Sequence, residues 1–166
     1  MKALSLIQPW ATLVLTGAKG FETRSWTTSY RGPLLIHAAK GFPVSARVFA
    51  HTEFTLGRLP ARIARGAIIG RVVLKTIHRA EIIAPTLTTL ERLYGDYTPG
   101  RWAWELAEAE MFETPIPYKG ALGLFEVALP VGGIWSIPSP PCELTPYSHD
   151  DRGNPTTGAD AQPDIH

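Results

Sequence analysis

The sequence contains a single cysteine, Cys142, so the chain cannot form an internal disulfide. This fits a reducing compartment, and we expect a cytoplasmic location. No window approaches the roughly 18 consecutive apolar residues of a membrane-spanning helix, so we expect no membrane association. The apolar N-terminus loosely imitates a signal peptide, but Gln8-Pro9-Trp10 interrupts the apolar run. With five histidines and one cysteine, we expect no metal site and no cofactor.

Several common enzyme motifs are also missing. The chain has no G-x-x-x-x-G-K-S/T, no G-x-G-x-x-G and no G-x-S-x-G, which argues against P-loop, dinucleotide-binding and α/β-hydrolase sites. His51-Thr52-Glu53 resembles the H-x-E of a zinc deaminase, but Pro141-Cys142 lacks the second cysteine of that motif. The remaining function classes are binding modules and enzymes that need no metal.

Charge is small overall and unevenly distributed. Residues 1–138 hold 15 Lys and Arg against 10 Asp and Glu, a balance of +5, whereas residues 139–166 hold one against five, a balance of −4. A mildly basic body suits an anionic ligand, but +5 is modest for a nucleic-acid-binding protein. Ordinary solubility charge explains the balance equally well.

The 166 residues, 45% of them hydrophobic, are sufficient for one domain with its own core. From Pro138 onward the chain has six prolines among Ser, Asp, Gly and Thr. Such a stretch buries too little apolar surface to offset its ordering entropy. We therefore predict a folded domain over residues 1–137 and a Pro-rich acidic disordered tail over residues 138–166.

Short strand signals alternate irregularly with helix signals along the body. The apolar patterns predict strands over residues 3–7, 21–26, 34–39, 67–83, 101–106 and 124–129. Helices are predicted over residues 10–16, 44–56 and 87–94. Because this order is not a regular βαβ alternation, it predicts a small α+β barrel and not a doubly wound sheet.

The segment from Gly17 to Trp26 offers the most chemistry. Strand alternation places Glu22, Arg24 and Trp26 on one face, and Lys19 enters from a glycine-flanked turn. A carboxylate can accept a hydrogen bond from a base, an indole can stack on it, and the two cations can neutralise phosphate. The same groups could instead form an ion pair on a sheet face, with the indole covering the barrel end.

Three motifs together resemble the ASCH domain. They are Leu4-Ser5-Leu6-Ile7-Gln8-Pro9-Trp10, the spacing Gly17-x-Lys19-x-x-Glu22-x-Arg24, and Tyr30-Arg31-Gly32 running into residues 34–39. Residues 68–70, 101–104 and 115–120 are similar to the subgroup that includes the endothelial-overexpressed lipopolysaccharide-associated factors. The resemblance covers about residues 3–130. It implies a small PUA-like mixed β-barrel with two or three flanking helices.

The resemblance also implies a cleft between barrel and helices, lined by Lys19, Glu22 and Arg24, with Gln8 and Trp10 beside it. Some members are thought to bind RNA, and related PUA-like domains read modified bases. In a bacterial branch that hydrolyses N4-acetylcytidine, a threonine nucleophile stands at the position equivalent to Glu22. Thr23 is adjacent here, but alternation points it to the opposite face.

Three residues outside the motif are further candidates. His37 lies on a core strand, where it is either a hydrogen-bonded core histidine or a titrating group at the cleft floor. Tyr118 and Lys119 lie in a predicted loop and could contact phosphate at the cleft rim. Trp102 and Trp104 share a face and are predicted to be core residues.

We therefore expect a module that binds RNA or a nucleoside-like ligand. Its expected contacts are Gln8, Trp10, Lys19, Glu22, Arg24, Trp26, His37, Tyr118 and Lys119. The alternative is a metal-independent hydrolase of N4-acylated cytidine or RNA, in which Glu22 activates water and Lys19 stabilises an oxyanion. A second alternative is an adaptor that binds a protein partner through its tail. The sequence does not indicate the oligomeric state.

Overall fold

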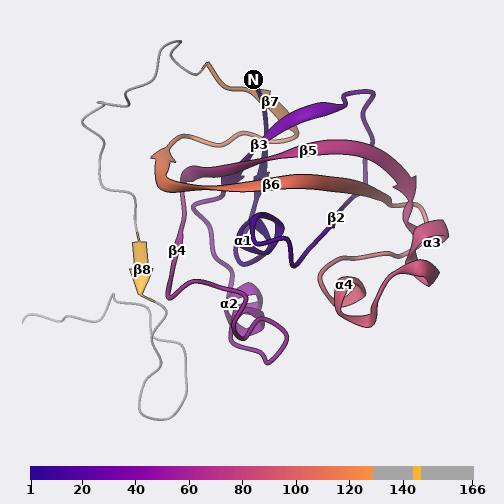
Figure 1. The fold of residues 1–166 in the computed structure, drawn as a ribbon, viewed down its shortest axis with the longest axis horizontal. Helices are drawn as coiled ribbons and strands as arrows, with labels where there is room; N and C mark the ends of the chain where they lie inside the picture. Colours follow the sequence, from indigo (N-terminus) through magenta and orange to yellow (C-terminus); the bar gives the residue numbers. More distant parts are fainter. Residues whose placement is uncertain (129–143, 147–166) are drawn as a thin grey trace, which may run out of the picture.

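A six-stranded mixed sheet curves into a half-barrel around the first helix in the computed structural model, which describes residues 1–128 and 144–146 (Figure 1). The order across the sheet is β2-β6-β5-β3-β1-β7, and only β1 and β3 run parallel. The strands are β1 (Lys2–Leu6), β2 (Phe21–Arg24), β3 (Gly32–Ala38), β5 (Ala67–Arg79), β6 (Trp102–Pro117) and β7 (Leu124–Glu126).

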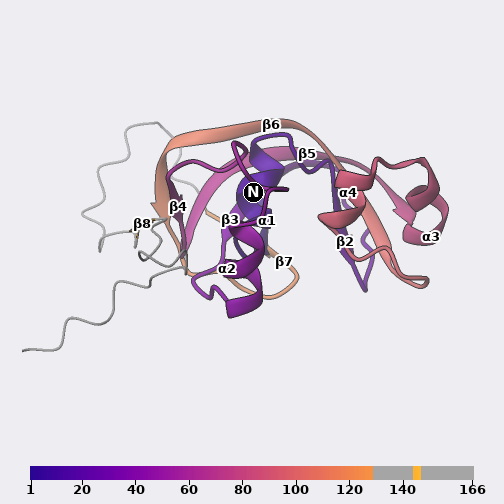
Figure 2. The ribbon, with the colours of Figure 1, turned by 90° about the horizontal axis from the view of Figure 1, so that it is seen from below.

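Most of the curvature comes from the long antiparallel ribbon of β5 and β6, which arches over α1 (Trp10–Leu15) in Figure 2. The pairing register shifts at three places along the ribbon. At one of them β6 has two residues, 108 and 109, opposite Val72, and Glu108 adopts a positive φ of 53°. Such bulges bend a strand and increase its twist, so the ribbon can wrap around a helix.

The other helices lie outside the curve of the half-barrel (Figure 1, Figure 2). α3 (Ala80–Ile83), the 3₁₀ turn η1 (Ala84–Thr86) and α4 (Thr89–Leu93) connect β5 to β6. α2 (Val44–Ala50) precedes β4 (Arg62–Ala64), which pairs with β8 (Leu144–Pro146) in a separate two-stranded sheet. None of the helices in the described residues is long and apolar enough to cross a membrane.

The sheet has a hydrophobic cluster on each face because side chains alternate along its strands. On the concave side Leu4, Leu6 and Trp104 are buried with the apolar residues of α1. Gly70 allows this close packing, since a Cβ there would lie 2.3 Å from the Glu110 carbonyl oxygen and 2.7 Å from a methyl group of Leu15. On the convex side Ala3, Leu35 and Ile68 form a smaller cluster; Phe112, Ile116, Tyr118 and Phe125 pack against it.

Several element bounds differ from the sequence prediction. The helix predicted over 44–56 ends at Ala50, because the hydroxyl groups of Thr52 and Thr55 donate to the last helical carbonyls and compete with further helix. The strand predicted over 67–83 ends at Arg79 and continues as α3. The strand predicted over 101–106 runs on to Pro117, where its mostly exposed residues carry no apolar alternation. The remaining predicted elements are present, with ends shifted by a few residues.

The predicted domain boundary at residue 137 lies outside the described residues. Most of the predicted tail does too, and β8 is the part of it that the structure describes.

Candidate functional site

Lys19, Glu22 and Arg24 converge on the concave side of the half-barrel. Lys19 follows α1, where its backbone N–H donates to the Leu13 carbonyl oxygen at 3.0 Å. The Glu22 carboxylate lies between the two cations, with Oε2 3.4 Å from Lys19 Nζ and Oε1 3.2 Å from Arg24 Nε. Strand alternation on β2 therefore places both Glu22 and Arg24 on the face that Trp104 and Trp102 share on β6.

Lys19 is buried inside this cluster and not at its surface. Its side chain is 0% exposed, and the ammonium also donates to the Phe21 carbonyl oxygen. Burial of an ammonium is tolerable only when a carboxylate and hydrogen-bond acceptors surround it, as they do here. Arg24 is 24% exposed, and its guanidinium donates to the Ser5 carbonyl oxygen at 2.9 Å. Of the two cations, only Arg24 reaches solvent.

Glu22 borders a hollow of about 310 Å³ along the outer edge of β2. This volume is at the lower end of the range of about 300–1,000 Å³ that is typical of small-molecule sites. The hollow is lined by Trp10, Glu22, Thr23, Leu93, Tyr94, Gly95 and Asp96. Trp10 stacks on Phe49 with 5.5 Å between ring centroids, and Tyr94 meets the same phenyl ring edge-on at 6.2 Å. Aromatic rings therefore form one wall of the hollow and a carboxylate forms another.

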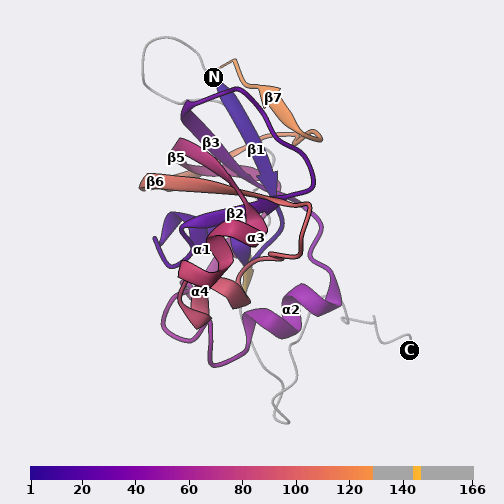
Figure 3. The ribbon, with the colours of Figure 1, turned by 90° about the vertical axis from the view of Figure 1, so that its right-hand side faces the viewer.

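The segment around α4 lies beside the unpaired edge of β2 (Figure 3). The residues that follow α4 also line the hollow. The Glu91 carboxylate accepts hydrogen bonds from the backbone N–H groups of Gly20 at 2.9 Å and Phe21 at 3.0 Å. The backbone N–H of Asp96 donates to the Thr23 hydroxyl at 3.0 Å. These bonds fix the glycine-flanked turn that carries Lys19 and satisfy part of an otherwise open strand edge.

Tyr97 adds a hydroxyl group beside the Glu91 carboxylate. It donates to Glu91 at 3.4 Å. Burial, the adjacent Glu91 carboxylate and the Glu22 charge together raise the pKa of Tyr97 well above its usual range, so the phenol stays protonated. Sequence patterns do not indicate Glu91, Tyr94, Asp96 and Tyr97. These residues follow the motif by about 70 residues, in a segment whose only signal is a short helix.

Two predicted ligand contacts, Gln8 and Trp26, are held by other parts of the protein and do not line the hollow beside Glu22. Gln8 is fully buried; its side-chain amide donates to the Ala64 carbonyl oxygen at 2.8 Å and accepts from the Thr12 backbone N–H at 3.2 Å. It thereby supplies the hydrogen-bond acceptor at the start of α1. Trp26 packs edge-on against Trp104, with ring centroids 4.7 Å apart.

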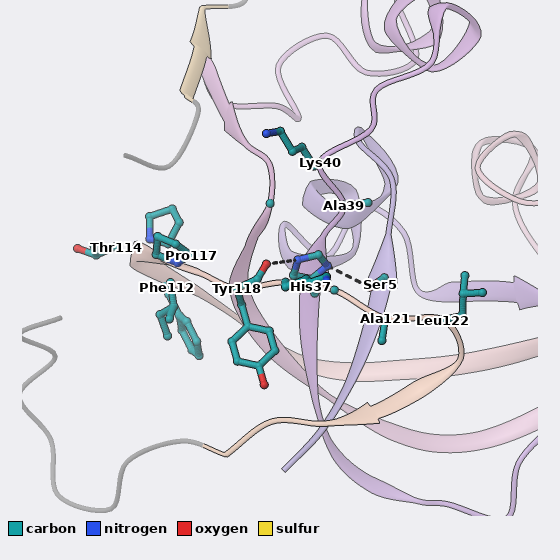
Figure 4. Close-up of a pocket in the computed structure, with 15 residues that line it drawn as sticks. Ser5, His37, Ala39, Lys40, Phe112, Thr114, Pro117, Tyr118, Ala121 and Leu122 are labelled. Carbon is teal, nitrogen blue, oxygen red and sulfur yellow. Dashed lines mark hydrogen bonds between the residues drawn. The ribbon is translucent and has the colours of Figure 1, made fainter. Parts of the chain in front are cut away.

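The other three predicted contacts line a second hollow, of about 1,100 Å³, on the convex face of the sheet (Figure 4). His37, Tyr118 and Lys119 border it together with Phe112 and Ile116. His37 is buried and hydrogen-bonded, as the first of its two predicted interpretations describes, and it does not lie at the floor of the hollow beside Glu22. Burial lowers the pKa of His37, and the hydrogen bond to Tyr118 partly opposes this shift. The predicted contacts are thus divided between two opposite faces.

No group of three or more His, Cys, Asp or Glu side chains in the part of the chain that the structure describes is arranged to hold a metal ion.

Comparisons with known proteins agree with this architecture. No curated protein matches the sequence. Among solved structures, the ASCH protein of Zymomonas mobilis is similar at a TM-score of 0.50 and 15% identity, covering 76% of this chain and 87% of that one. A tyrosine-to-phenylalanine variant of the same protein gives a TM-score of 0.50 at 15% identity, covering 76% of this chain and 89% of that one. These likenesses concern the fold, and they confirm the predicted small α+β PUA-like class. The model of the ASCH domain family matches residues 4–116, and the chain belongs to this family.

Proposed function

We propose that this ASCH protein binds RNA or a nucleotide-like ligand, with a base in the hollow beside Glu22. The observation that carries the proposal is a carboxylate held between two cations at the wall of an aromatic-lined hollow. A carboxylate offers about four lone-pair directions, and its two oxygens each meet one cation here. Glu22 therefore keeps capacity to accept a hydrogen bond from the exocyclic amine of a base.

Lys19 and Arg24 have different roles in this proposal. Lys19 is fully buried, so it orients the Glu22 carboxylate and does not contact phosphate. Arg24 holds the other carboxylate oxygen and ties it to the carbonyl of Ser5 on β1. A fixed carboxylate loses little conformational entropy when a base binds, which favours affinity.

The walls and rim supply the remaining contacts. The Trp10 indole lines the hollow, and base–aromatic stacking contributes about 1–3 kcal/mol per base. Arg101 contacts Asp96, which lines the hollow, with Arg101 Nε 3.3 Å from Asp96 Oδ2. Its guanidinium is the cation that we assign to the phosphate of the ligand, since arginine binds phosphate through several N–H groups.

Fluorescence anisotropy with labelled single-stranded hexamers of each base, and competition by free nucleotides, tests the proposal. Glu22→Gln keeps the shape of the side chain, and we expect binding to weaken by roughly 5- to 150-fold, the equivalent of about 1–3 kcal/mol for a base-reading contact. Glu110→Gln is the matched control, because Glu110 pairs with Arg71 on the exposed ribbon. Equal affinities for the two variants would refute the assignment of Glu22.

Hydrolysis through Lys19 and Glu22 has weaker support. That mechanism requires the Lys19 ammonium to reach a developing oxyanion, and this ammonium is enclosed by Glu22 and the Phe21 carbonyl. The adaptor hypothesis depends on the tail, most of which lies outside the described residues, and it stays a prediction.

A further inference from the structure

The second hollow contains a serine–histidine pair that the proposed function does not use. Ser5 on β1 and His37 on β3 are register partners in the parallel pair of strands, and both point to the convex face. Ser5 Oγ lies 3.0 Å from His37 Nδ1, and His37 Nε2 lies 2.9 Å from the Tyr118 carbonyl oxygen. Figure 4 shows the imidazole between the other two groups.

The acceptor at one end of the network determines which atom donates in each of the two hydrogen bonds. A carbonyl oxygen can only accept, so His37 Nε2 carries the hydrogen that binds Tyr118. In the neutral imidazole Nδ1 is then an acceptor, and the Ser5 hydroxyl donates to it. Burial favours this neutral form of His37. A hydroxyl that donates to an imidazole, which a third group orients, is the arrangement that activates a serine nucleophile.

The surroundings of the pair define the substrate class. The hollow has a volume of about 1,100 Å³, and its walls include Phe112, Ile116 and Tyr118. Apolar walls of this kind suit an acyl chain or an aromatic ring. Ser5 and His37 both border the hollow, so a group bound at their end of it lies beside the hydroxyl.

We propose that Ser5 and His37 form a nucleophile–base pair that hydrolyses carboxylic esters with an apolar acyl group. Ser5 Oγ bonds to the carbonyl carbon while its proton passes to His37 Nδ1. The ester C–O bond then breaks, and the alcohol leaves with that proton. Water attacks the acyl-serine in the same way: its proton passes through Nδ1 back to Ser5, and the carboxylic acid is released.

The loop after Tyr118 fits against this pair. A Cβ on Gly120 would lie 2.4 Å from His37 Cε1 and 2.7 Å from Ser5 Oγ. Glycine is therefore required for the backbone to approach both reacting side chains. The backbone N–H groups of Gly120 and Ala121 have no acceptor among the described residues, and both residues line the hollow. We assign these N–H groups to the oxyanion of the tetrahedral intermediate.

A fluorophosphonate probe tests the nucleophile directly, because an activated serine displaces fluoride and forms a stable phosphonate ester. The full-length protein is incubated with the probe, and the modified peptide is mapped by mass spectrometry. We expect an adduct on Ser5 and none on exposed serines such as Ser25. His37→Gln, whose amide can keep a hydrogen bond to the Tyr118 carbonyl, should lose the adduct while the melting temperature changes little.

Turnover of p-nitrophenyl butyrate gives an independent readout. We expect His37→Gln to lose at least ~10²-fold in kcat, the usual size of an acid–base contribution, and Ser5→Ala to lose at least as much because it removes the nucleophile. Gly120→Ala should abolish labelling, whereas Gly41→Ala, whose Cβ would meet nothing within 4 Å, should not.

Three outcomes would overturn the ester-hydrolase proposal: no adduct on Ser5 under conditions that label a known serine hydrolase, labelling that survives His37→Gln, or turnover that survives Ser5→Ala. This proposal does not rest on the proposed RNA binding, because the hollow beside Glu22 is separate from the hollow that contains Ser5 and His37.

Discussion

The buried ammonium of Lys19 leads to a stability prediction that a matched control can isolate. Lys19→Met removes the charge and keeps a side chain of similar length. Lys75→Met is the same substitution in another Lys–Glu pair, where Nζ lies 2.9 Å from Glu108 Oε1. The side chains of Lys75 and Glu108 are 50% and 64% exposed, against 0% and 12% for Lys19 and Glu22. The two variants therefore differ mainly in burial.

The expected costs follow from this difference. Removing one partner of a buried ion pair costs about 3–5 kcal/mol, because the remaining charge is left without compensation. Glu22 keeps Arg24 at 3.2 Å, so we expect the lower end, about 3 kcal/mol, for Lys19→Met. An exposed pair contributes about 0–1 kcal/mol, and Lys75→Met should fall in that range.

Urea unfolding monitored by tryptophan fluorescence measures both free energies of unfolding. With a slope of about 2 kcal/mol/M, a loss of 3 kcal/mol lowers the midpoint by roughly 1.5 M. The double variant Lys19→Met with Glu22→Gln should cost less than the two single variants added together. We expect this difference in unfolding free energy to be at least about 1 kcal/mol, since the two residues are in contact. If Lys19→Met costs no more than Lys75→Met, the ammonium is not enclosed as described, and a direct contact between Lys19 and phosphate becomes the better assignment.

Two further predictions concern the core and the dependence of stability on pH. Gly70→Ala should destabilise the protein by about 1–3 kcal/mol or more, because its Cβ would meet a backbone oxygen at 2.3 Å. The control Gly41→Ala, whose Cβ would meet nothing within 4 Å, should lie within about 0.5 kcal/mol of wild type. Similar melting temperatures for the two variants would contradict the packing of α1 on the sheet. Because burial lowers the pKa of His37 in the folded state, the unfolded chain binds this proton more readily as the pH falls below about 6.5. Stability should then decrease from pH 7.5 toward pH 5, and His37→Gln should reduce that slope in urea titrations; an unchanged slope would show that His37 titrates normally.

The sequence determined the local features of this protein. Alternation along residues 21–24 placed Glu22 and Arg24 together on one face and Thr23 on the other, because side chains on a strand repeat every second residue. The same rule predicted a shared face for Trp102 and Trp104. The motif spacing indicates the ASCH family without reference to the fold, and the apolar runs locate most of the strands.

Only the tertiary structure decided which faces are buried and which hollows form. Periodicity assigns two residues to one face of a strand, but it does not say that α1 fills the concave side and encloses Lys19. Nor does it bring Glu91 to the turn before β2, because that contact spans about 70 residues and depends on how β5 and β6 return the chain. His37 and Glu22 lie on opposite sides of one sheet for the same reason: the pairing and curvature of the strands are set by contacts distant in sequence, which local patterns do not encode.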